Sequence, residues 1–206
     1  MPAEMQTTGR RERNKQQKLE RITAAARELF GEHGVDLVTT QQIADRADVG
    51  AGTVFLYAKT KAELLLLVHN VKLAGEIETG LAAADETTDA LDAIMEIIGP
   101  IVVCNREQIE NGRTYLRELV FGDPAEPHHA KGLELTRRVD RAMAAILQRV
   151  GSTDERDADQ LATIISSIMI ISMTATSYAP LSDDEVLRNI RQQVGVLLRV
   201  PRARCP

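Results

Sequence analysis

The side chains best suited to contact another molecule lie in the stretch TTQQIADRADVGAGTVFLYAKTKAELL, which runs from Thr39 to Leu65. Two short segments, each with apolar residues at helical spacing, lie on either side of the sequence VGAG. Gly50 and Gly52 allow a tight turn there and let the backbone approach a phosphate. Two short helices joined by such a turn, with a third helix bracing them, form a helix-turn-helix, whose second helix fits the major groove of DNA.

Helical phase predicts which side chains of the second short helix, over residues 53–59, face outward. Val54 and Ala58 fall on its inner face. The outward and flanking positions are Thr53, Phe55, Leu56 and Tyr57. Lys61 opens the next helix, where its ammonium group and the positive end of the helix dipole both favour a phosphate. The two aromatic residues also suit the core of a three-helix domain, and the lysine also suits a solvated surface.

Helical patterns continue along the whole chain. The first is predicted from Arg10 to His33, after a disordered stretch over residues 1–9. Capping boxes, in which a Glu or Gln follows a Ser or Thr after three positions, predict further helix starts. They lie at Thr39, Thr60, Ser152 and Ser182. Pro100 is expected to kink or split a helix over residues 87–104. We expect about nine helices, no strands and an all-α fold.

The chain divides into a small front domain, residues 10–61, and a larger domain, residues 62–206. Apolar residues make up 44% of the chain and aromatic residues 3%, as in a soluble globular protein with an aliphatic core. The net charge is −5, but residues 1–61 carry ten basic and eight acidic side chains, whereas the remainder carries 15 and 22. This asymmetry favours an anionic partner for the front domain, although a solvated helix face explains it equally well.

Several features indicate a cytoplasmic protein without a membrane span. The polar N-terminus MPAEMQTTGRRERNKQQ does not have the pattern of a signal peptide. The most apolar run, residues 161–175, is too short and too rich in Ser and Thr to cross a bilayer. Cys104 and Cys205 have no Cys or His at metal-ligand spacing, which predicts free thiols in a reducing compartment and no metal or other cofactor.

Residues 19–68 resemble the DNA-binding domain of the TetR family of bacterial transcriptional regulators. The segments AARELFGEHGVDLVTTQQIA, VGAGTVF and KTKAELL match that family's pattern in order and spacing. The resemblance implies a ligand-responsive regulator, a repressor, that binds a palindromic double-stranded DNA operator as a homodimer. It also implies DNA contacts by the residues that match the family's, which are Thr40, Gln41, Ala51, Gly52, Thr53, Phe55, Leu56, Tyr57 and Lys61.

Three positions depart from the family's usual pattern. Phe55 stands where the family commonly has Tyr, and Ala51 where it commonly has a polar residue such as Lys. Ala58 stands where a bulky apolar residue is usual. The first two departures leave base reading mainly to Gln41, Thr53 and contacts of Ala51 or Leu56 with thymine methyl groups, and the third leaves room under the recognition helix. The arm GRRERNK would then add contacts to phosphates or to the minor groove.

The last two predicted helices carry the apolar surface expected of a subunit interface. The run over residues 161–175 is apolar nearly all round, so we expect one side to meet the domain body and the other a partner subunit, in a four-helix interface. One thick monomeric core is the alternative. The predicted interface residues are Ile164, Ile168, Ile171, Val186, Leu187, Ile190, Val194, Leu197 and Leu198.

The resemblance also implies a pocket for a small-molecule effector among the middle helices. Candidate lining residues, each of which also suits a plain core, are Met95, Ile98, Tyr115, Leu119, Phe121, Met143, Ile146, Met169 and Met173. Arg113 and Arg117 could hold a carboxylate, although pairing with a neighbouring Glu on the surface is the simpler interpretation. His128 and His129 are expected to be exposed near a helix start.

The sequence does not assemble a nucleophile with a base and an orienting group, so we do not expect an enzyme. The alternative is a helical small-molecule-binding protein or enzyme whose helix-turn-helix is vestigial, which the departures at Ala51, Phe55 and Ala58 would favour. A pure dimerisation module is a third interpretation, and it predicts neither DNA binding nor a cavity.

Overall fold

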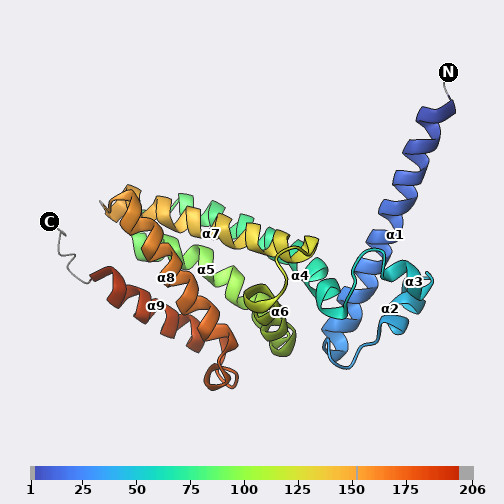
Figure 1. The fold of residues 1–206 in the computed structure, drawn as a ribbon. Helices are drawn as coiled ribbons and strands as arrows, with labels where there is room; N and C mark the ends of the chain where they lie inside the picture. The colour runs from blue at the N-terminus through green and yellow to red at the C-terminus, as the bar shows by residue number, and fades with distance from the viewer. Residues whose placement is uncertain (1–2, 152, 200–206) are drawn as a thin grey trace.

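The computed structural model describes residues 3–151 and 153–199, which form nine α-helices and one short 3-10 helix (Figure 1). The elements are α1 (Ala3–His33), α2 (Thr40–Arg46), α3 (Ala51–Val54), α4 (Lys61–Asp85), α5 (Ala90–Arg106), α6 (Ile109–Phe121), α7 (Pro127–Gly151), α8 (Glu155–Thr174), η1 (Thr176–Tyr178) and α9 (Asp183–Arg199). Strands are absent from this part of the chain, which confirms the prediction of an all-α fold.

Helices α1 to α3 form a small domain at one end of the molecule, and α4 leads from it into the larger domain (Figure 1). One face of α1 packs on α2 and on α4, and α2 packs on α3. Buried apolar side chains that recur at helical spacing make these contacts. They include Ile22, Ala26, Leu29, Phe30, Ile43, Ala44, Val54 and Ala58. The alanines among them allow the three helices to approach closely.

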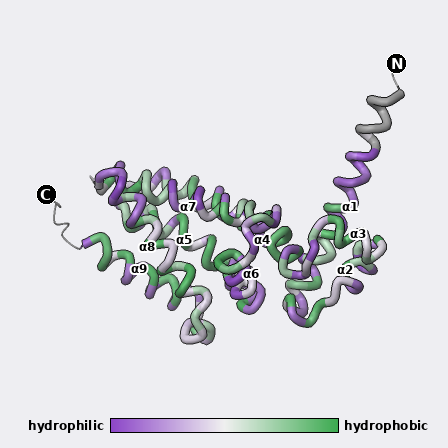
Figure 2. The backbone as a smooth tube through the Cα atoms, in the orientation of Figure 1, coloured by the Kyte–Doolittle hydropathy of each residue, from purple (hydrophilic) through white to green (hydrophobic). Residues whose placement is uncertain are grey.

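Helix α1 begins at Ala3, earlier than the start at Arg10 that the sequence predicted, so residues 3–9 belong to the helix, while residues 1–2 of the predicted disordered stretch lie outside the described residues. Residues 11–18 are exposed and polar, and this part of the helix projects beyond the core as a hydrophilic segment (Figure 2). Arg, Lys, Gln and Glu have good intrinsic helix propensity, which favours continuation of the helix beyond the core, and the Tyr57 hydroxyl, which donates to Lys15 O, ties this segment to the domain.

Side-chain caps fix several helix starts. At α2 both bonds of the predicted capping box are present, since Thr39 accepts from the Gln42 amide and donates its own amide to the Gln42 side chain. Ser182 and Glu185 form the same box before α9. At α8 the cap is Asp154, which accepts from Asp157 N, and the predicted cap at Ser152 lies outside the described residues.

Helix α5 runs without interruption from Ala90 to Arg106 with Pro100 inside it, so Pro100 does not split this helix, which was one of the two predicted outcomes. The most extensive packing of α5 is against α4, and the two helices approach each other closely at Gly80 of α4. A Cβ atom on Gly80 would lie 2.7 Å from Glu96 O and 2.9 Å from Ile97 Cα, so only glycine permits this approach of the two backbones. The close α4–α5 pair forms one wall of the larger domain.

The larger domain surrounds a core of aliphatic side chains with helices α4 to α9 (Figure 1). Ile94, Ile97, Ile98 and Val102 of α5 are fully buried, as are Tyr115 of α6 and Ile165 of α8. Among the described residues, none of the helices combines the length and the apolarity that crossing a bilayer requires.

Candidate nucleic-acid interface and effector cavity

The short helix α3 and the turn after it present a mixed apolar and polar surface to solvent. Leu56 is 82% exposed and Phe55 50% exposed, whereas Val54 and Ala58 are buried, which confirms the predicted phase. Helix α3 ends at Val54, so the predicted helix over residues 53–59 is shorter than expected. Its turn continues to Ala58, because Ala58 N donates to Val54 O. We call residues 51–58 the recognition segment.

The remaining predicted DNA contacts surround this segment. Gln41 is exposed on α2 and donates to Asp45 Oδ1 at 2.7 Å, so its amide is oriented but remains at the surface. Gly52 is exposed, and a Cβ there would meet no heavy atom of the described residues within 4 Å. Thr40, Ala51 and Thr53 are partly exposed. Ala51, Gly52 and Thr53 lie on α3, whereas Thr40 is the first residue of α2.

Two side chains predicted to contact phosphates also hold the domain together. The Tyr57 hydroxyl donates to Lys15 O of α1 at 3.0 Å, so it cannot donate to a phosphate while that bond is kept. Lys61 Nζ donates to Asp36 O at 3.1 Å, which leaves two of its three ammonium hydrogens for a phosphate. The geometry thus favours Lys61 over Tyr57 as a phosphate contact.

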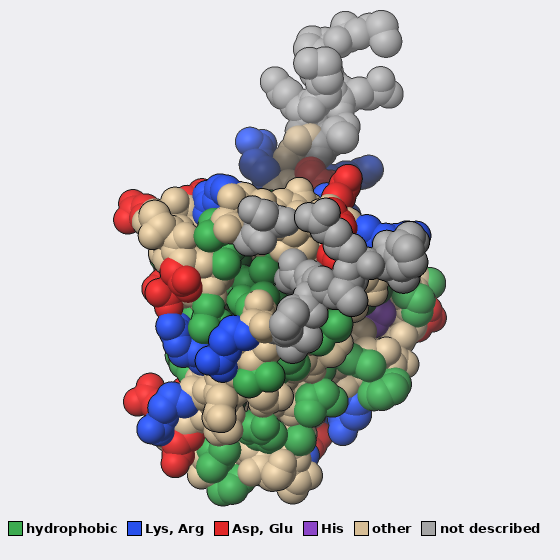
Figure 3. All heavy atoms as spheres, turned by 90° about the vertical axis from the view of Figure 1, so that its left-hand side faces the viewer, with side chains coloured by type: hydrophobic (Ala, Val, Ile, Leu, Met, Phe, Trp, Pro, Cys, Tyr) green, Lys and Arg blue, Asp and Glu red, His purple; other side chains and the backbone are tan. Residues whose placement is uncertain are grey.

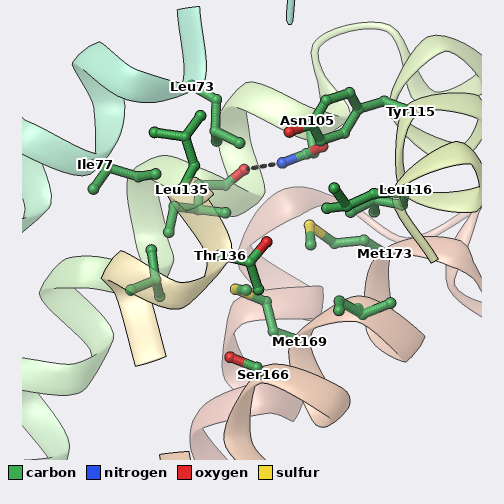
Figure 4. Close-up of a pocket in the computed structure, with 14 residues that line it drawn as sticks. Leu73, Ile77, Asn105, Tyr115, Leu116, Leu135, Thr136, Ser166, Met169 and Met173 are labelled. Carbon is green, nitrogen blue, oxygen red and sulfur yellow. Dashed lines mark hydrogen bonds between the residues drawn. The ribbon is translucent and has the colours of Figure 1, made fainter. Parts of the chain in front are cut away.

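A small cavity of about 30 Å³ lies between α4, α5, α6, α7 and α8 (Figure 4). Its lining is mostly aliphatic: Leu73, Ile77, Ile101, Leu116, Leu119, Leu135, Val139, Met169, Ile170 and Met173. Asn105, Tyr115, Thr136 and Ser166 contribute polar atoms. None of these described lining residues carries a charge.

The structure brings together four of the nine side chains predicted for the pocket. These are Tyr115, Leu119, Met169 and Met173. Ile98, Met143 and Ile146 are buried elsewhere in the core, away from the lining of this cavity. Met95 lies instead beside Leu187 in a surface groove between α5 and α9, and Phe121, at the end of α6, is 82% exposed. The latter two predictions are therefore corrected.

Sequence reasoning missed the polar lining residues. Asn105, Thr136 and Ser166 interrupt apolar stripes on α5, α7 and α8, and such an interruption is the signal that could have identified them. Asn105 Nδ2 donates to Ile101 O at 2.9 Å, the bond drawn in Figure 4. Ser166 Oγ donates to Asp140, whose pKa is raised by burial. These bonds fix the directions of the Asn105 and Ser166 side chains.

Two buried ionisable groups stand beside this cavity. Burial lowers the pKa of His69 to about 4, although its Nε2 donates to Asn105 Oδ1 at 3.1 Å. The Tyr115 ring stacks at a tilt on His69, with 4.2 Å between the ring centroids, and burial raises the Tyr115 pKa far above its usual value. Both groups are therefore neutral near pH 7.

The two adjacent histidines of α7 are not exposed, contrary to the prediction. His129 is 3% exposed, and its Nε2 donates to Leu119 O at 3.1 Å. His128 is partly buried against the small domain, where its Nε2 donates to Tyr57 O at 2.9 Å. Arg113 pairs with Glu110 at 3.1 Å, in agreement with the surface interpretation of that arginine.

The predicted interface residues separate into two groups. Val186, Ile190 and Val194 of α9 are fully buried within the subunit, so they cannot meet a partner, and this part of the prediction is corrected. Apolar side chains that do reach the surface are Ile164 at 44% exposed and Ile171 at 60% exposed. Partly exposed are Ile168, Leu187, Leu197 and Leu198. Figure 3 shows hydrophobic side chains at the surface on the end of the molecule that carries the C-terminal helices.

Comparison with known proteins agrees with this geometry. The family model described as "Bacterial regulatory proteins, tetR family" matches residues 22–68, which include α2, α3, the last part of α1 and the first part of α4. Comparison with curated proteins gave no match.

Solved structures share the fold. The regulator PfmR from Thermus thermophilus is 21% identical with a TM-score of 0.60, over 84% of this chain and 96% of that one. FadR from Thermus thermophilus, a repressor in complex with lauroyl-CoA, is 23% identical with a TM-score of 0.63, over 91% and 98%. FadR from Bacillus halodurans is 16% identical with a TM-score of 0.58, over 89% and 99%. Residues 22–68 thus match the DNA-binding domain of the TetR family of bacterial transcriptional regulators, and the chain as a whole shares the fold of these solved structures.

Proposed function

We propose that this transcriptional regulator is a cytoplasmic repressor that binds a palindromic DNA operator as a homodimer and leaves it when a small molecule occupies the cavity. The observation that carries the proposal is the outward face of the recognition segment, which lies on the same chain as a buried apolar cavity. A surface that reads DNA and a separate site that takes a ligand are the two parts that such a switch requires.

On the DNA side, the exposed side chain of Leu56 and the partly exposed Thr53 suit contacts with base edges and thymine methyl groups in the major groove. Gln41 adds an amide that can donate and accept. Lys61 at the start of α4 and the exposed basic side chains of α1, among them Arg11 and Lys15, supply charge for phosphates. Because few of these side chains can form hydrogen bonds with base edges, we expect part of the operator recognition to depend on DNA shape.

The homodimer would form through the exposed faces of α8 and α9. Ile164 and Ile171 lie seven residues apart, so they fall on one face of α8, and Val196 of α9 is 53% exposed. A two-fold axis through this surface would place two recognition segments on one side of the assembly. Such a dimer binds half-sites about 34–36 Å apart.

The effector is a mainly apolar molecule. The cavity has aliphatic walls and no charge among its described lining residues, so a buried carboxylate or ammonium group would find no partner there. A volume of about 30 Å³ holds roughly one water molecule. A ligand must therefore displace side chains, and Met169 and Met173 are flexible enough to move. A fatty-acyl chain meets these requirements.

A mobility-shift assay tests the proposal. The protein is titrated into the duplex that lies upstream of its own gene at low salt, with and without lauroyl-CoA as the acyl probe. A shift that lauroyl-CoA reverses is expected. The absence of a shift with any upstream duplex at low salt would contradict DNA binding, whereas a shift that does not respond to lauroyl-CoA would contradict only the acyl effector.

A further inference from the structure

We infer that His128 is a positioning residue for the recognition segment and that Asn70 and Tyr115 connect it to the cavity by hydrogen bonds. The inference rests on the proposed function, since it names the route by which cavity and DNA surface are coupled. The route leads from α6 through α4 to the first turn of α7, and from there to the small domain.

The route begins at the cavity wall. Tyr115 lines the cavity and is fully buried, and its hydroxyl donates to Asn70 Oδ1 of α4 at 2.9 Å. Helix α7 lies directly against this bond at Gly132, where a Cβ atom would be 3.2 Å from Asn70 Oδ1 and 3.4 Å from the Tyr115 hydroxyl. A ligand that moves the Tyr115 ring must therefore disturb both Asn70 and α7.

The second step fixes the first turn of α7. Asn70 Nδ2 donates to His128 O at 2.8 Å, while His128 N donates to Glu63 Oε1 at 2.7 Å. Thr60 caps α4 by accepting from Glu63 N. The Glu63 carboxylate accepts from His128 N of α7 instead of from the Thr60 amide, so the capping box predicted at Thr60 is only half formed. Residues of α4 thus bind both the N–H and the C=O of His128. A shift of the Asn70 amide would therefore shift the His128 side chain as well.

The third step reaches the DNA-binding surface. His128 Nε2 donates to Tyr57 O at 2.9 Å, at the C-terminal end of the recognition segment. Close by, Lys59 Nζ pairs with Glu126 Oε1 at 2.7 Å. The Tyr57 hydroxyl in turn holds Lys15 of α1. The first turn of α7 therefore fixes the position of the C-terminal end of the recognition segment relative to α1.

A competing route runs along α6 alone. Asn111 lies one turn before Tyr115 on that helix, and it accepts from Val35 N and donates to Phe30 O, both at 2.7 Å. That contact reaches the turn between α1 and α2 and not the recognition segment. The two routes thus predict changes at different backbone amides, which makes them separable by experiment.

Amide hydrogen exchange on the full chain, without DNA, tests the inference. Tyr115→Phe keeps the ring and removes the hydroxyl. We expect about five-fold faster exchange at residues 128–131 and 56–59, with no change at residues 34–36. The matched control is Tyr178→Phe, which removes a hydroxyl that accepts from Gln193 of α9 and takes no part in the route. Faster exchange confined to α4 and α6, or seen at residues 34–36 instead of 56–59, would overturn the route.

A second measurement tests the role of His128 on DNA. His128→Ala should weaken binding to the upstream duplex about five-fold, and His128→Gln, which retains an N–H donor at the same reach, should restore it. Adding Tyr115→Phe to His128→Ala should cause no further loss, because the connection is already broken. Equal affinity of the Ala and Gln variants, or additive losses, would reject the inference. If the wild-type protein shifts no DNA, the proposed function fails, while the exchange result still decides the route.

Discussion

Gly112 of α6 lies so close to Asn105 of α5 that a Cβ atom on the glycine would be 1.8 Å from Asn105 O. The two helices therefore touch through their backbones, beside the side chain of Asn105 that lines the cavity. Because α6 carries Tyr115 one turn after Gly112 and α5 carries Asn105, this contact fixes the spacing of the two polar groups in the cavity wall.

Gly112→Ala is expected to destabilise the protein by about 3 kcal/mol, since the added methyl group overlaps a carbonyl that cannot move without its helix. The measurement is urea unfolding monitored by circular dichroism. Gly75→Ala is the matched control, because it also lies in a helix but its Cβ would meet no described heavy atom within 4 Å. There we expect a gain of about 0.5–1 kcal/mol from helix propensity. Similar losses for both variants would contradict the close contact.

His69 should make the stability depend on pH between about 6.5 and 4. Its pKa is about 4 in the folded protein and about 6.5 in an unfolded chain. As the pH falls through this window, the unfolded state takes up a proton that the folded state does not, so the free energy of unfolding decreases, by about 3 kcal/mol in total.

The test compares unfolding free energies of the wild-type protein and His69→Gln at several pH values. Gln retains a donor toward Asn105 Oδ1 but does not titrate. The unfolding free energy of the wild-type protein minus that of His69→Gln should therefore decrease from pH 7 to pH 4. Other titrating groups are common to both proteins and cancel in the comparison. A difference that stays constant with pH would show that His69 titrates normally in the fold.

Lys61→Ala should weaken binding to every duplex alike and reduce the slope of log affinity against log salt by about one unit, because one phosphate contact is lost. The bond of Lys61 to Asp36 O is also removed, so circular dichroism must show that the small domain remains folded. Lys131→Ala, on the exposed surface of α7, is the control and should leave the slope unchanged. An unaltered slope for Lys61→Ala would count against the phosphate contact.

The sequence predicted the elements that local physics determines. Capping residues such as Thr39 and Ser182 marked helix starts, and the 3.6-residue period placed Val54 and Ala58 inside. It could not distinguish the apolar face of α9 that packs on its own subunit, with Ile190, from the faces that remain exposed. Which face of α9 is buried depends on the helices that pack against it, and these helices are distant in the sequence.

The same limit explains the errors near the cavity. Phe121 has the composition of a pocket residue, yet it ends α6 and points into solvent, while the polar Asn105 lies in the cavity wall. His128 was expected in an exposed loop, because nothing local shows that the small domain covers the start of α7. Contacts between domains are invisible to a periodic pattern.

The homodimer is the last expectation that the exposed surfaces allow us to test. Ile171 is 60% exposed on the apolar face of α8, and a glutamate there would bury a charge in the proposed interface. Ile171→Glu should therefore yield a folded monomer in analytical ultracentrifugation. Because two linked half-site contacts become one, affinity for the upstream duplex should fall by about 100-fold. Val103→Glu, at a 44% exposed position of α5, is the control and should remain dimeric. If Ile171→Glu remains dimeric, subunits do not associate through this face.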